Sequence, residues 1–353
     1  MSPQPGIHAT ITALPQELVD GYGRVPFGIF PDTVPRINGR QADYRTPMGK
    51  RAGARARHFH YKQFQYFGII SDRLLAGCAL ADTAWLGLAF FYIFDPESRR
   101  LREFTWRSPL ARSLQLSDSP TRGESRFCQR GVDIRMGYGQ ERGTVTVKSL
   151  SVALPGTRLE AAMPEAGFTP MSICTRTGIN GWTYANKVAG TAVRGFLEQQ
   201  GQKTALESLD AFGHHDFSAG YMRSPTFWNW ACFSGRTGDG RAIGANLSCG
   251  VNETGYTENC LWVDGELLKV DTVAFDYDRE QLMSSWTITS YDGRVALRFT
   301  PEGRHRERMN LALFASNFSQ LFGRFEGTLR LKQNETVHIG EQYGFVEEQY
   351  AKW

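Results

Sequence analysis

Short runs of alternating apolar and polar residues, separated by turn dipeptides, dominate the second half of the chain. Asp239-Gly240, Asp264-Gly265 and Asp292-Gly293 each stand between two such runs. Asp-Gly favours the two-residue turn of a β-hairpin, and alternation is the period of a strand with one buried face. The pattern predicts three hairpins and, from about Thr226 to the C-terminus, consecutive antiparallel strands of the kind found in β-barrels.

The first half shows the same pattern less regularly. FHYKQFQYFGIIS, LLAGCALA and LGLAFFYIF are three strand candidates in a row, and RFCQRGVDIRMGYG with GTVTVKSLSVALP forms another pair. The best helical window covers residues 191–207, although it contains Gly195 and Gly201, which weaken a helix. We therefore expect an all-β fold with few helices.

The length of the chain favours two structural units. At 353 residues it exceeds the size at which one hydrophobic core usually stops growing. Phe64-x-Tyr66 and Trp228-x-Trp230 each place two rings on one face of a predicted strand, which is a weak internal repeat. The small, Pro- and Gly-containing stretch AAMPEAGFT separates the halves. We predict an N-terminal barrel-like unit, residues 1–165, and a C-terminal barrel, residues 166–353.

Composition and charge describe an ordinary globular protein that is rich in aromatic rings. The net charge of +4 is too small to indicate nucleic-acid binding. Aromatic residues make up 12% of the chain, which suits either barrel cores or a cavity for a hydrophobic ligand. The local exception is the basic stretch KRAGARAR, residues 50–57. We interpret it as a solvated loop, with contact to phosphate or a membrane surface as the alternative.

The N-terminal sequence and the cysteines indicate the cellular setting. No basic stretch followed by an apolar one begins the chain, so no secretory signal is predicted. The longest apolar run, residues 85–94, is too short to span a bilayer as a helix. Since the six cysteines are widely spaced, we expect free, mostly buried thiols. The expectation is a cytoplasmic protein without stable membrane insertion.

The richest polar and aromatic cluster is GHHDFSAGYMRSPTFWNW, residues 213–230. Asp216 is the candidate proton donor, because a carboxyl group buried among apolar walls keeps its proton near neutral pH. Alternatively, Asp216 caps a turn or pairs with Arg223. His214 and His215 can act as bases, but neighbours on a strand point to opposite faces, so at most one faces a cavity. We name His215 as the candidate.

Aromatic side chains of the same segment are candidate ligand contacts: Tyr221, Trp228 and Trp230. The two tryptophans stand at positions i and i+2 of a predicted strand and therefore share a face. Such rings pack a barrel face whether or not a ligand is present, so core packing is the simpler interpretation.

A second polar cluster stands at the start of a predicted strand, in TENCLWVDG. Its position predicts a barrel mouth, where Glu258 is a further catalytic candidate. Asn259 and Asn246, on the preceding strand, are candidate ligand-binding residues, because amides orient a polar head group. The alternative is that both amides satisfy backbone groups at strand ends.

Tyr184 and Lys187, in WTYANK, are a third candidate pair for ligand binding, since a buried lysine changes its pKa readily. An exposed lysine is the commoner case. His58 and His60 share a face, but no third ligand at a suitable spacing joins them, so we predict no metal site and no cofactor. Phosphate-loop, dinucleotide and nucleophile-elbow motifs do not occur in the sequence.

Several ordered blocks resemble one protein family. They are HFHYKQFQYFGIISDRLLAGCALAD, TPMSICTRTGINGWTYANK, WNWACFSG, TENCLWVDG, FDYD, NFSQLFGRFEG and the terminal GFVEEQYAKW. From about His58 to Trp353 the chain is similar to the uncharacterised bacterial family called domain of unknown function 2804. That family is remotely similar to the carotenoid hydratase and tocopherol cyclase group.

The resemblance implies two lipocalin-like (calycin) barrels that hold a hydrophobic small molecule. Acid-assisted hydration, cyclisation and isomerisation are among the activities of the relatives. Asp216, Trp228 and Trp230 match the carboxylate and ring positions of the family. Family members often end with Glu-Glu-His, whereas this chain has Gln349 at the matching position, so a role for that imidazole is not carried over.

The leading hypothesis is therefore a protein that binds a hydrophobic small molecule, such as a lipid, terpenoid or polyketide-like compound, in a barrel cavity. Its enzymatic form adds cofactor-independent acid–base chemistry. One alternative is a non-catalytic lipid or pigment carrier. The other is a structural or interaction protein whose barrels are filled by side chains. A cavity larger than ~300 Å³ beside Trp228 and Trp230 would exclude the filled barrel.

Overall fold

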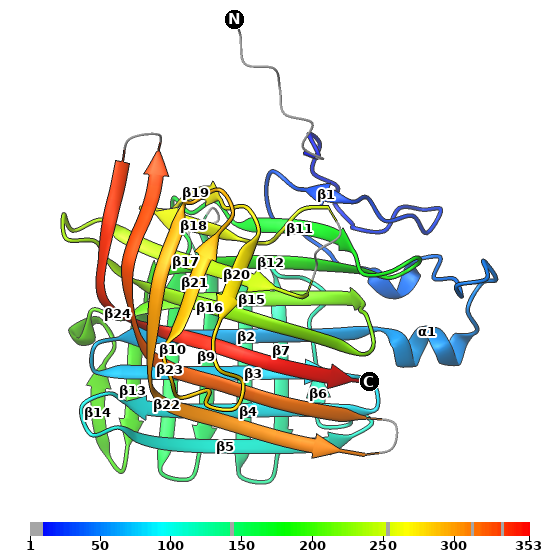
Figure 1. Cartoon of the computed structure of the whole chain (residues 1–353). Helices are drawn as coiled ribbons and strands as arrows, with labels where there is room; N and C mark the ends of the chain where they lie inside the picture. The colour runs from blue at the N-terminus through cyan, green and yellow to red at the C-terminus, as the bar shows by residue number, and fades with distance from the viewer. Residues whose placement is uncertain (1–9, 142–144, 252–254, 312–313, 333–334) are drawn as a thin grey trace, which may run out of the picture.

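Antiparallel sheets make up almost the whole molecule (Figure 1). The structure, a computed structural model, describes residues 10–353 except 142–144, 252–254, 312–313 and 333–334. Strands account for 62% and helices for 4% of the chain. The predicted all-β fold with few helices is confirmed.

The central sheet takes strands from both halves of the chain. Its eight strands, in order across the sheet, are β1 (Gly28–Ile29), β11 (Met171–Arg176), β12 (Trp182–Ala192), β15 (Phe212–Tyr221), β2 (Lys62–Ser71), β3 (Leu74–Asp82), β4 (Leu86–Asp95) and β5 (Arg100–Pro109). Hydrogen-bonded pairing of β15 with β2 therefore crosses the predicted boundary at residue 165. The division into units 1–165 and 166–353 stays a prediction.

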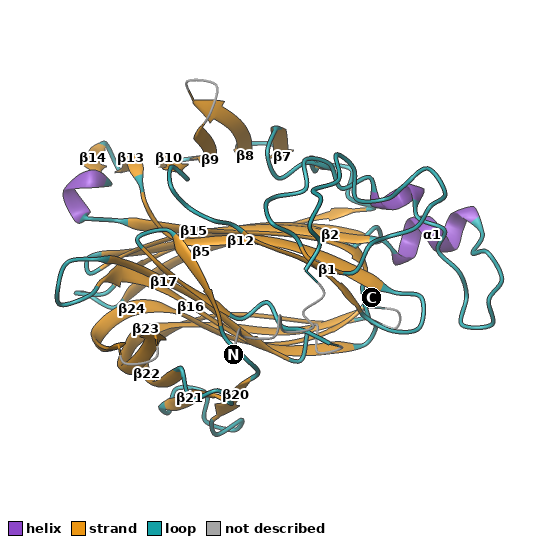
Figure 2. Cartoon of the chain, turned by 90° about the horizontal axis from the view of Figure 1, so that it is seen from above, coloured by secondary structure: helices purple, strands orange, loops and turns teal. Residues whose placement is uncertain are grey.

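A seven-stranded sheet covers one face of the central sheet (Figure 2). Its strands, in order, are β14 (Gln202–Ala205), β13 (Arg194–Gln199), β10 (Thr157–Pro164), β9 (Val145–Leu154), β8 (Val132–Glu141), β7 (Gly123–Gln129) and β6 (Leu114–Gln115). A hydrophobic core that includes Phe67, Ile134 and Phe217 lies between the two sheets.

A nine-stranded sheet, built from the last third of the chain, faces the other side of the central sheet (Figure 2). In order its strands are β19 (Glu266–Lys269), β18 (Cys260–Val263), β17 (Ala242–Cys249), β16 (Thr226–Arg236), β24 (Glu335–Lys352), β23 (Ala315–Lys332), β22 (Val295–Asn310), β21 (Trp286–Ser290) and β20 (Val273–Asp276). The sheet curls into a half-barrel in which β17 contacts β20. Phe233, Trp286 and Phe299 belong to the core inside this curl.

Turn chemistry explains which local predictions succeed. The three Asp-Gly turns join β16 to β17, β18 to β19 and β21 to β22, so the predicted hairpins are confirmed. The helix predicted at residues 191–207 is wrong. Gln200 and Gly201 both have positive φ angles, 51° and 81°, and form the tight turn of the β13–β14 hairpin. A short 3-10 helix, η2 (Glu207–Leu209), follows.

Two further predictions from the sequence concern the basic stretch and the cysteines. Residues 50–57 were predicted as a loop, but the second half of the stretch lies in helix α1 (Ala54–His60), which follows the 3-10 helix η1 (Gly39–Gln41). All six cysteines are free and four of them are buried, as predicted. Among the described residues, no helix is long and apolar enough to cross a membrane.

The central and nine-stranded sheets approach closely where two glycines meet. Gly190, at a register irregularity in β12, has a φ of +93° and lies against Gly244 of β17. A Cβ atom at Gly244 would lie 2.3 Å from the carbonyl oxygen of Ala189. Nearer the start of β12, at Thr183 and Lys187, a cavity lies between the same two sheets.

We expect Gly244→Ala to lower the free energy of unfolding by about 2–3 kcal/mol, because the added methyl group meets backbone that cannot move aside. Gly238→Ala is the control, since a Cβ there meets no heavy atom within 4 Å. Urea denaturation of both variants checks the prediction. Equal stability of the two variants would contradict the close contact between the sheets.

Candidate active site

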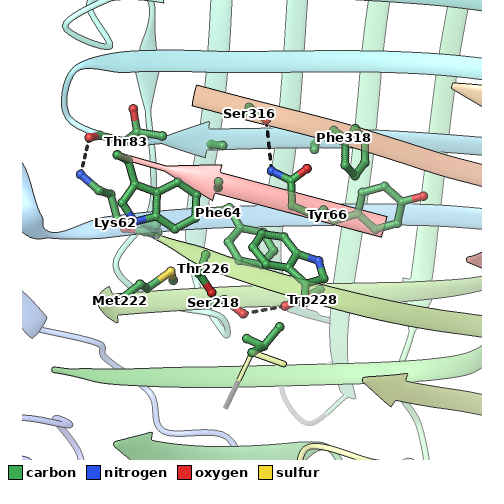
Figure 3. A pocket seen from close by; sticks show the side chains of 18 of the residues that line it. Lys62, Phe64, Tyr66, Thr83, Ser218, Met222, Thr226, Trp228, Ser316 and Phe318 are labelled. Carbon is green, nitrogen blue, oxygen red and sulfur yellow. Dashed lines mark hydrogen bonds between the residues drawn. The ribbon is translucent and has the colours of Figure 1, made fainter. Parts of the chain in front are cut away.

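The cavity between the central and nine-stranded sheets has a volume of about 180 Å³ and a mostly apolar wall (Figure 3). Its rings and aliphatic side chains include Phe64, Tyr66, Leu88, Phe90, Trp228 and Phe318. This volume is below ~300 Å³, the cavity size above which a barrel filled by its own side chains would be excluded. A ligand larger than the cavity would extend through its mouth.

Lys187 of β12 lies between two carboxyl groups in the cavity wall, one from the central sheet and one from the segment that leads into the nine-stranded sheet. Its Nζ atom is 2.9 Å from Oδ2 of Asp216 in β15 and 2.6 Å from Oε1 of Glu258, two residues before β18. Lys187 stands directly opposite Asp216 in the pairing of β12 with β15. All three side chains are buried. We refer to Lys187, Asp216 and Glu258 as the lysine cluster.

Burial and the short ion pairs act against each other in the lysine cluster. Burial alone would lower the pKa of Lys187, but the charges of Asp216 and Glu258 raise it above its ordinary value, so the ammonium group stays charged. Burial raises the pKa of Asp216, which Lys187 opposes and Glu258 reinforces. For Glu258, the attraction of Lys187 and hydrogen bonds from Lys187 and Ser248 outweigh burial and lower the pKa.

Glu347 of β24 adds a third carboxyl group to the cavity wall. Gln320 Nε2 donates a hydrogen bond to Oε1 at 2.6 Å, and Trp228 Nε1 donates to Oε2 at 3.3 Å. Burial raises the pKa of Glu347 to about 7, while the Trp228 N–H and the Lys187 charge oppose the rise. Around Lys187, the wall therefore holds three carboxyl groups, Asp216, Glu258 and Glu347, against one ammonium group.

A chain of hydrogen bonds leads from Glu347 into the central sheet. The hydroxyl groups of Tyr66 and Tyr92 are 2.6 Å apart, and Tyr66 donates to Oε1 of Gln320 at 3.5 Å. Gln320 in turn donates to Glu347. The register of the nine-stranded sheet sets this arrangement, because Gln320 and Trp230 are the residues opposite Glu347 on its two neighbouring strands.

Five of the residues selected from the sequence line the cavity: Lys187, Asp216, Trp228, Trp230 and Glu258. Asp216 pairs with Lys187 and not with Arg223, the partner expected in the alternative interpretation of the sequence. Lys187 is buried instead of exposed, and its ammonium group lies 5.9 Å from the centre of the Trp230 ring.

Three other candidates point to the opposite face of the central sheet and do not line the cavity. His215 packs against Phe67 and Tyr138, on the side of the seven-stranded sheet. Tyr184 lies three residues before Lys187, and an odd separation on a strand reverses the face. Tyr221 stacks on Tyr44 at 3.9 Å. Their positions therefore do not support the catalytic role predicted for His215 or the ligand contacts predicted for Tyr184 and Tyr221.

His214 has the orientation that the sequence analysis assigned to His215. It faces the nine-stranded sheet and contacts Tyr66, Trp230 and Phe345. Burial lowers its pKa to about 3, and the Lys187 charge adds to the effect. His214 is therefore neutral at physiological pH and does not line the cavity.

Asn246 and Asn259 act within the protein and do not line the cavity. Asn246 accepts a hydrogen bond from Trp230 Nε1 at 2.7 Å and donates to the carbonyl oxygen of Glu258 at 3.1 Å. Asn259 accepts from the backbone N–H of Ser248 and donates to the carbonyl oxygen of Asp271. These hydrogen bonds match the alternative interpretation, in which the two amides bind neighbouring groups of the protein and not a ligand.

Glu347 was not selected from the sequence, although a signal for it is present. Phe345, Glu347 and Gln349 alternate along one strand, so the buried Phe345 indicates that the other two share its face. Gln349 also lines the cavity and donates a hydrogen bond to Ser316 Oγ at 3.1 Å. No group of three or more His, Cys, Asp or Glu side chains among the described residues is suited to a metal ion.

Comparisons with known proteins agree with the resemblance seen in the sequence. The chain belongs to the family described as Domain of unknown function (DUF2804), whose model matches residues 8–353. No curated protein matches the chain.

Several solved structures are similar to the chain, among them the following two. One is a protein of Nitrosomonas europaea provisionally assigned as AttH, with 12% identity over 82% of this chain and 92% of that chain and a TM-score of 0.47. The other is kievitone hydratase of Nectria haematococca, with 12% identity over 82% of this chain and 89% of that chain and a TM-score of 0.49.

The raised pKa of Glu347 predicts a pH-dependent stability. Between its ordinary value of 4.5 and the value of about 7 in the fold, the folded chain holds a proton that the unfolded chain has lost. The free energy of unfolding therefore falls as the pH rises through this window. Glu347→Gln removes the effect, so we expect the variant to gain up to about 3 kcal/mol relative to wild type between about pH 5 and pH 8.

Urea denaturation at several pH values measures the gain. The control is Glu326→Gln, because Glu326 is exposed, its side chain retaining 54% of its accessible surface. A stability difference between Glu347→Gln and wild type that does not change with pH would contradict the assignment.

Removal of the central ammonium group tests the lysine cluster. We expect Lys187→Met to lower the free energy of unfolding by about 3–5 kcal/mol at neutral pH, because Asp216 and Glu258 stay buried without a counter-charge. The loss is expected to shrink at low pH, where both carboxyl groups bind protons. Thermal and urea denaturation of this variant and of the surface variant Lys203→Met provide the comparison. A loss no larger than that of Lys203→Met would refute the cluster.

Proposed function

We propose that the protein binds a largely apolar small molecule in this cavity and acts on it by acid–base chemistry. The observation that carries the proposal is the excess of carboxyl groups over ammonium groups around Lys187. Glu258 has a lowered pKa and pairs with Lys187, while the pKa values of Asp216 and Glu347 are raised. Because its pKa is about 7, Glu347 retains its proton in a substantial fraction of the molecules near neutral pH, where an ordinary carboxyl group has lost it, and Asp216 beside it has a raised pKa.

A protonated carboxyl group beside an apolar cavity is suited to protonating a double bond or an epoxide. In such a step the carboxyl O–H bond breaks, a C–H or O–H bond forms, and the substrate becomes a cation. Water or a group of the same molecule then adds to the cation, or a neighbouring C–H proton leaves it. The released proton returns to the carboxylate, so the step is complete without an oxidant or reductant.

The residues around the cavity have separate roles in this proposal. Asp216, a carboxylate paired with Lys187 in the resting protein, is the proton donor once it has received the proton that Glu347 holds. Lys187 stabilises the carboxylate that remains after proton transfer. The faces of Trp228 and Trp230 suit a developing positive charge, since aromatic faces attract cations. The substrate class is a lipid, terpenoid or polyketide-like compound with an unsaturated or strained group.

A non-catalytic carrier needs the cavity but not the retained proton, and this difference separates the two functions. Organic extraction of the purified protein, followed by mass spectrometry, identifies the small molecules that it holds. Ala81→Trp, which narrows the cavity, is expected to lose them. An empty wild-type extract would count against both functions.

Incubation of the extracted compound with wild type and with Asp216→Asn then tests the chemistry. We expect the variant to retain binding and to lose turnover by at least about 100-fold, the usual contribution of a general acid. The matched control is Asp276→Asn, on the exposed part of β20. Unchanged turnover in Asp216→Asn would remove Asp216 as the acid, and the absence of any turnover in wild type would favour the carrier.

A further inference from the structure

The mouth of the cavity opens at the end of the molecule that carries helix α1 and the C-terminus (Figure 1). Residues at the start of β2, the end of β3 and the end of β15 line it, as do the exposed Arg223 and the terminal Trp353. Lys62, in this lining, donates a hydrogen bond to the carbonyl oxygen of Thr83 (Figure 3). It donates another to the carbonyl oxygen of Phe59 in α1. The mouth and α1 are thus directly connected.

Four large apolar side chains project into solvent from the loops at this end. The exposed fractions are 87% for Met48, 69% for Ile179, 49% for Leu110 and 42% for Trp85. They come from four loops that are far apart in the sequence. Single exposed apolar residues are common on protein surfaces, but a group of them around one opening marks a surface of interaction.

Contacts between the loops join these side chains into one surface. Trp85 stacks on Phe59 of α1 at 3.9 Å, and its carbonyl oxygen accepts a hydrogen bond from the backbone N–H of Leu110. The loop of Ile179 is held against the loop of Met48, because Asn180 Nδ2 donates to the carbonyl oxygen of Thr46 at 2.7 Å. We call Met48, Trp85, Leu110 and Ile179, with residues 50–57, the mouth surface.

The charge on the mouth surface is positive. Between Gly39 and His60 the chain has six basic side chains and one acidic side chain, Asp43. Asp43 is already engaged by Arg45 and Arg51. Among the described residues, the exposed Lys50, Arg55 and Arg223 form no ion pair, so they present uncompensated charge beside the cavity mouth.

We propose that the mouth surface docks on an anionic lipid membrane and that the cavity mouth then faces the lipid. Apolar side chains that project between basic ones enter the interface of a bilayer while the basic groups attract anionic head groups. Tryptophan at such a position is typical of membrane interfaces. A nucleic acid would use the basic groups but would leave Met48, Leu110 and Ile179 in water, which favours the membrane. Docking would let an apolar substrate enter the cavity without crossing water.

Vesicle flotation of the full-length protein tests the docking. We expect partition onto vesicles with about one third phosphatidylglycerol to be at least about ten-fold stronger than onto pure phosphatidylcholine at low salt. High salt is expected to reduce the difference. The variant Met48→Ser/Leu110→Ser should lose at least about three-fold in partition on both vesicles, and Lys50→Glu/Arg55→Glu at least about ten-fold on the anionic ones.

Two surface variants at other positions serve as controls. Tyr291→Ser removes a side chain as exposed as Met48, at 87%, from the turn before β22, and Lys203→Glu reverses a charge on β14. Both are expected to bind vesicles like wild type. Circular dichroism on heating confirms that each variant is folded.

Three outcomes would overturn the docking: no vesicle binding, equal binding by wild type and both mouth-surface variants, or retention on single-stranded RNA but not on vesicles. The experiment does not depend on turnover, and Asp216→Asn is expected to bind vesicles normally. Failure of the docking and failure of the proposed acid–base function are therefore distinguishable.

Discussion

The buried ammonium group of Lys187 is the interaction on which the cavity depends. It contacts Asp216 from its own sheet and Glu258 from the segment that leads into the facing sheet, so the same charge fixes a strand pair and joins two sheets. A charged lysine in such a place is stable only while both carboxyl groups accompany it. Asp216 and Glu258 already outnumber the ammonium group, and Glu347, close enough to interact with the charges of Lys187 and Asp216, adds a third carboxyl group. A proton retained on one of these carboxyl groups reduces the excess negative charge around Lys187.

The alternation of residues was sufficient to predict the strands and the Asp-Gly hairpins, because both depend on neighbouring residues. Long-range pairing was not predictable in this way. β15 pairs with β2, with Asp216 directly opposite Tyr66, although about half of the chain separates them. That pairing decides which face each residue occupies, and it explains why His215 was selected where His214 has the matching orientation. Tyr184 and Lys187 differ from this case, because their separation of three residues on one strand is itself enough to place them on opposite faces.

Asp216, Glu258, Lys187 and the two tryptophans could be selected from the sequence because their residue types stand out in apolar surroundings. Glu347 could not be separated from Glu348 until the neighbours of β24 were known, because adjacent glutamates look alike in a sequence. Asn246 and Asn259 show the opposite difficulty. Their residue type suits a ligand, but the carbonyl and N–H groups that they bind belong to the surrounding strands.

The arrangement of the three sheets leaves the cavity with one closed end and one open end. Gly190 and Gly244 bring the central and nine-stranded sheets together, whereas the starts of β2, β12 and β16 border the cavity and its mouth. The acid groups lie inside, and the basic, apolar mouth surface lies outside. A hydrophobic molecule taken from a membrane would thus pass from lipid to rings to carboxyl groups without full exposure to water.

Infrared difference spectroscopy tests the central claim, the retained proton, most directly. Spectra of wild type minus Asp216→Asn and of wild type minus Glu347→Gln, recorded from about pH 5 to pH 9, separate a protonated carboxyl group from a carboxylate. The account predicts that at neutral pH at least one difference shows the C=O stretch of a protonated carboxyl group, which fades as the pH rises. Carboxylate bands alone in both differences at neutral pH would contradict it.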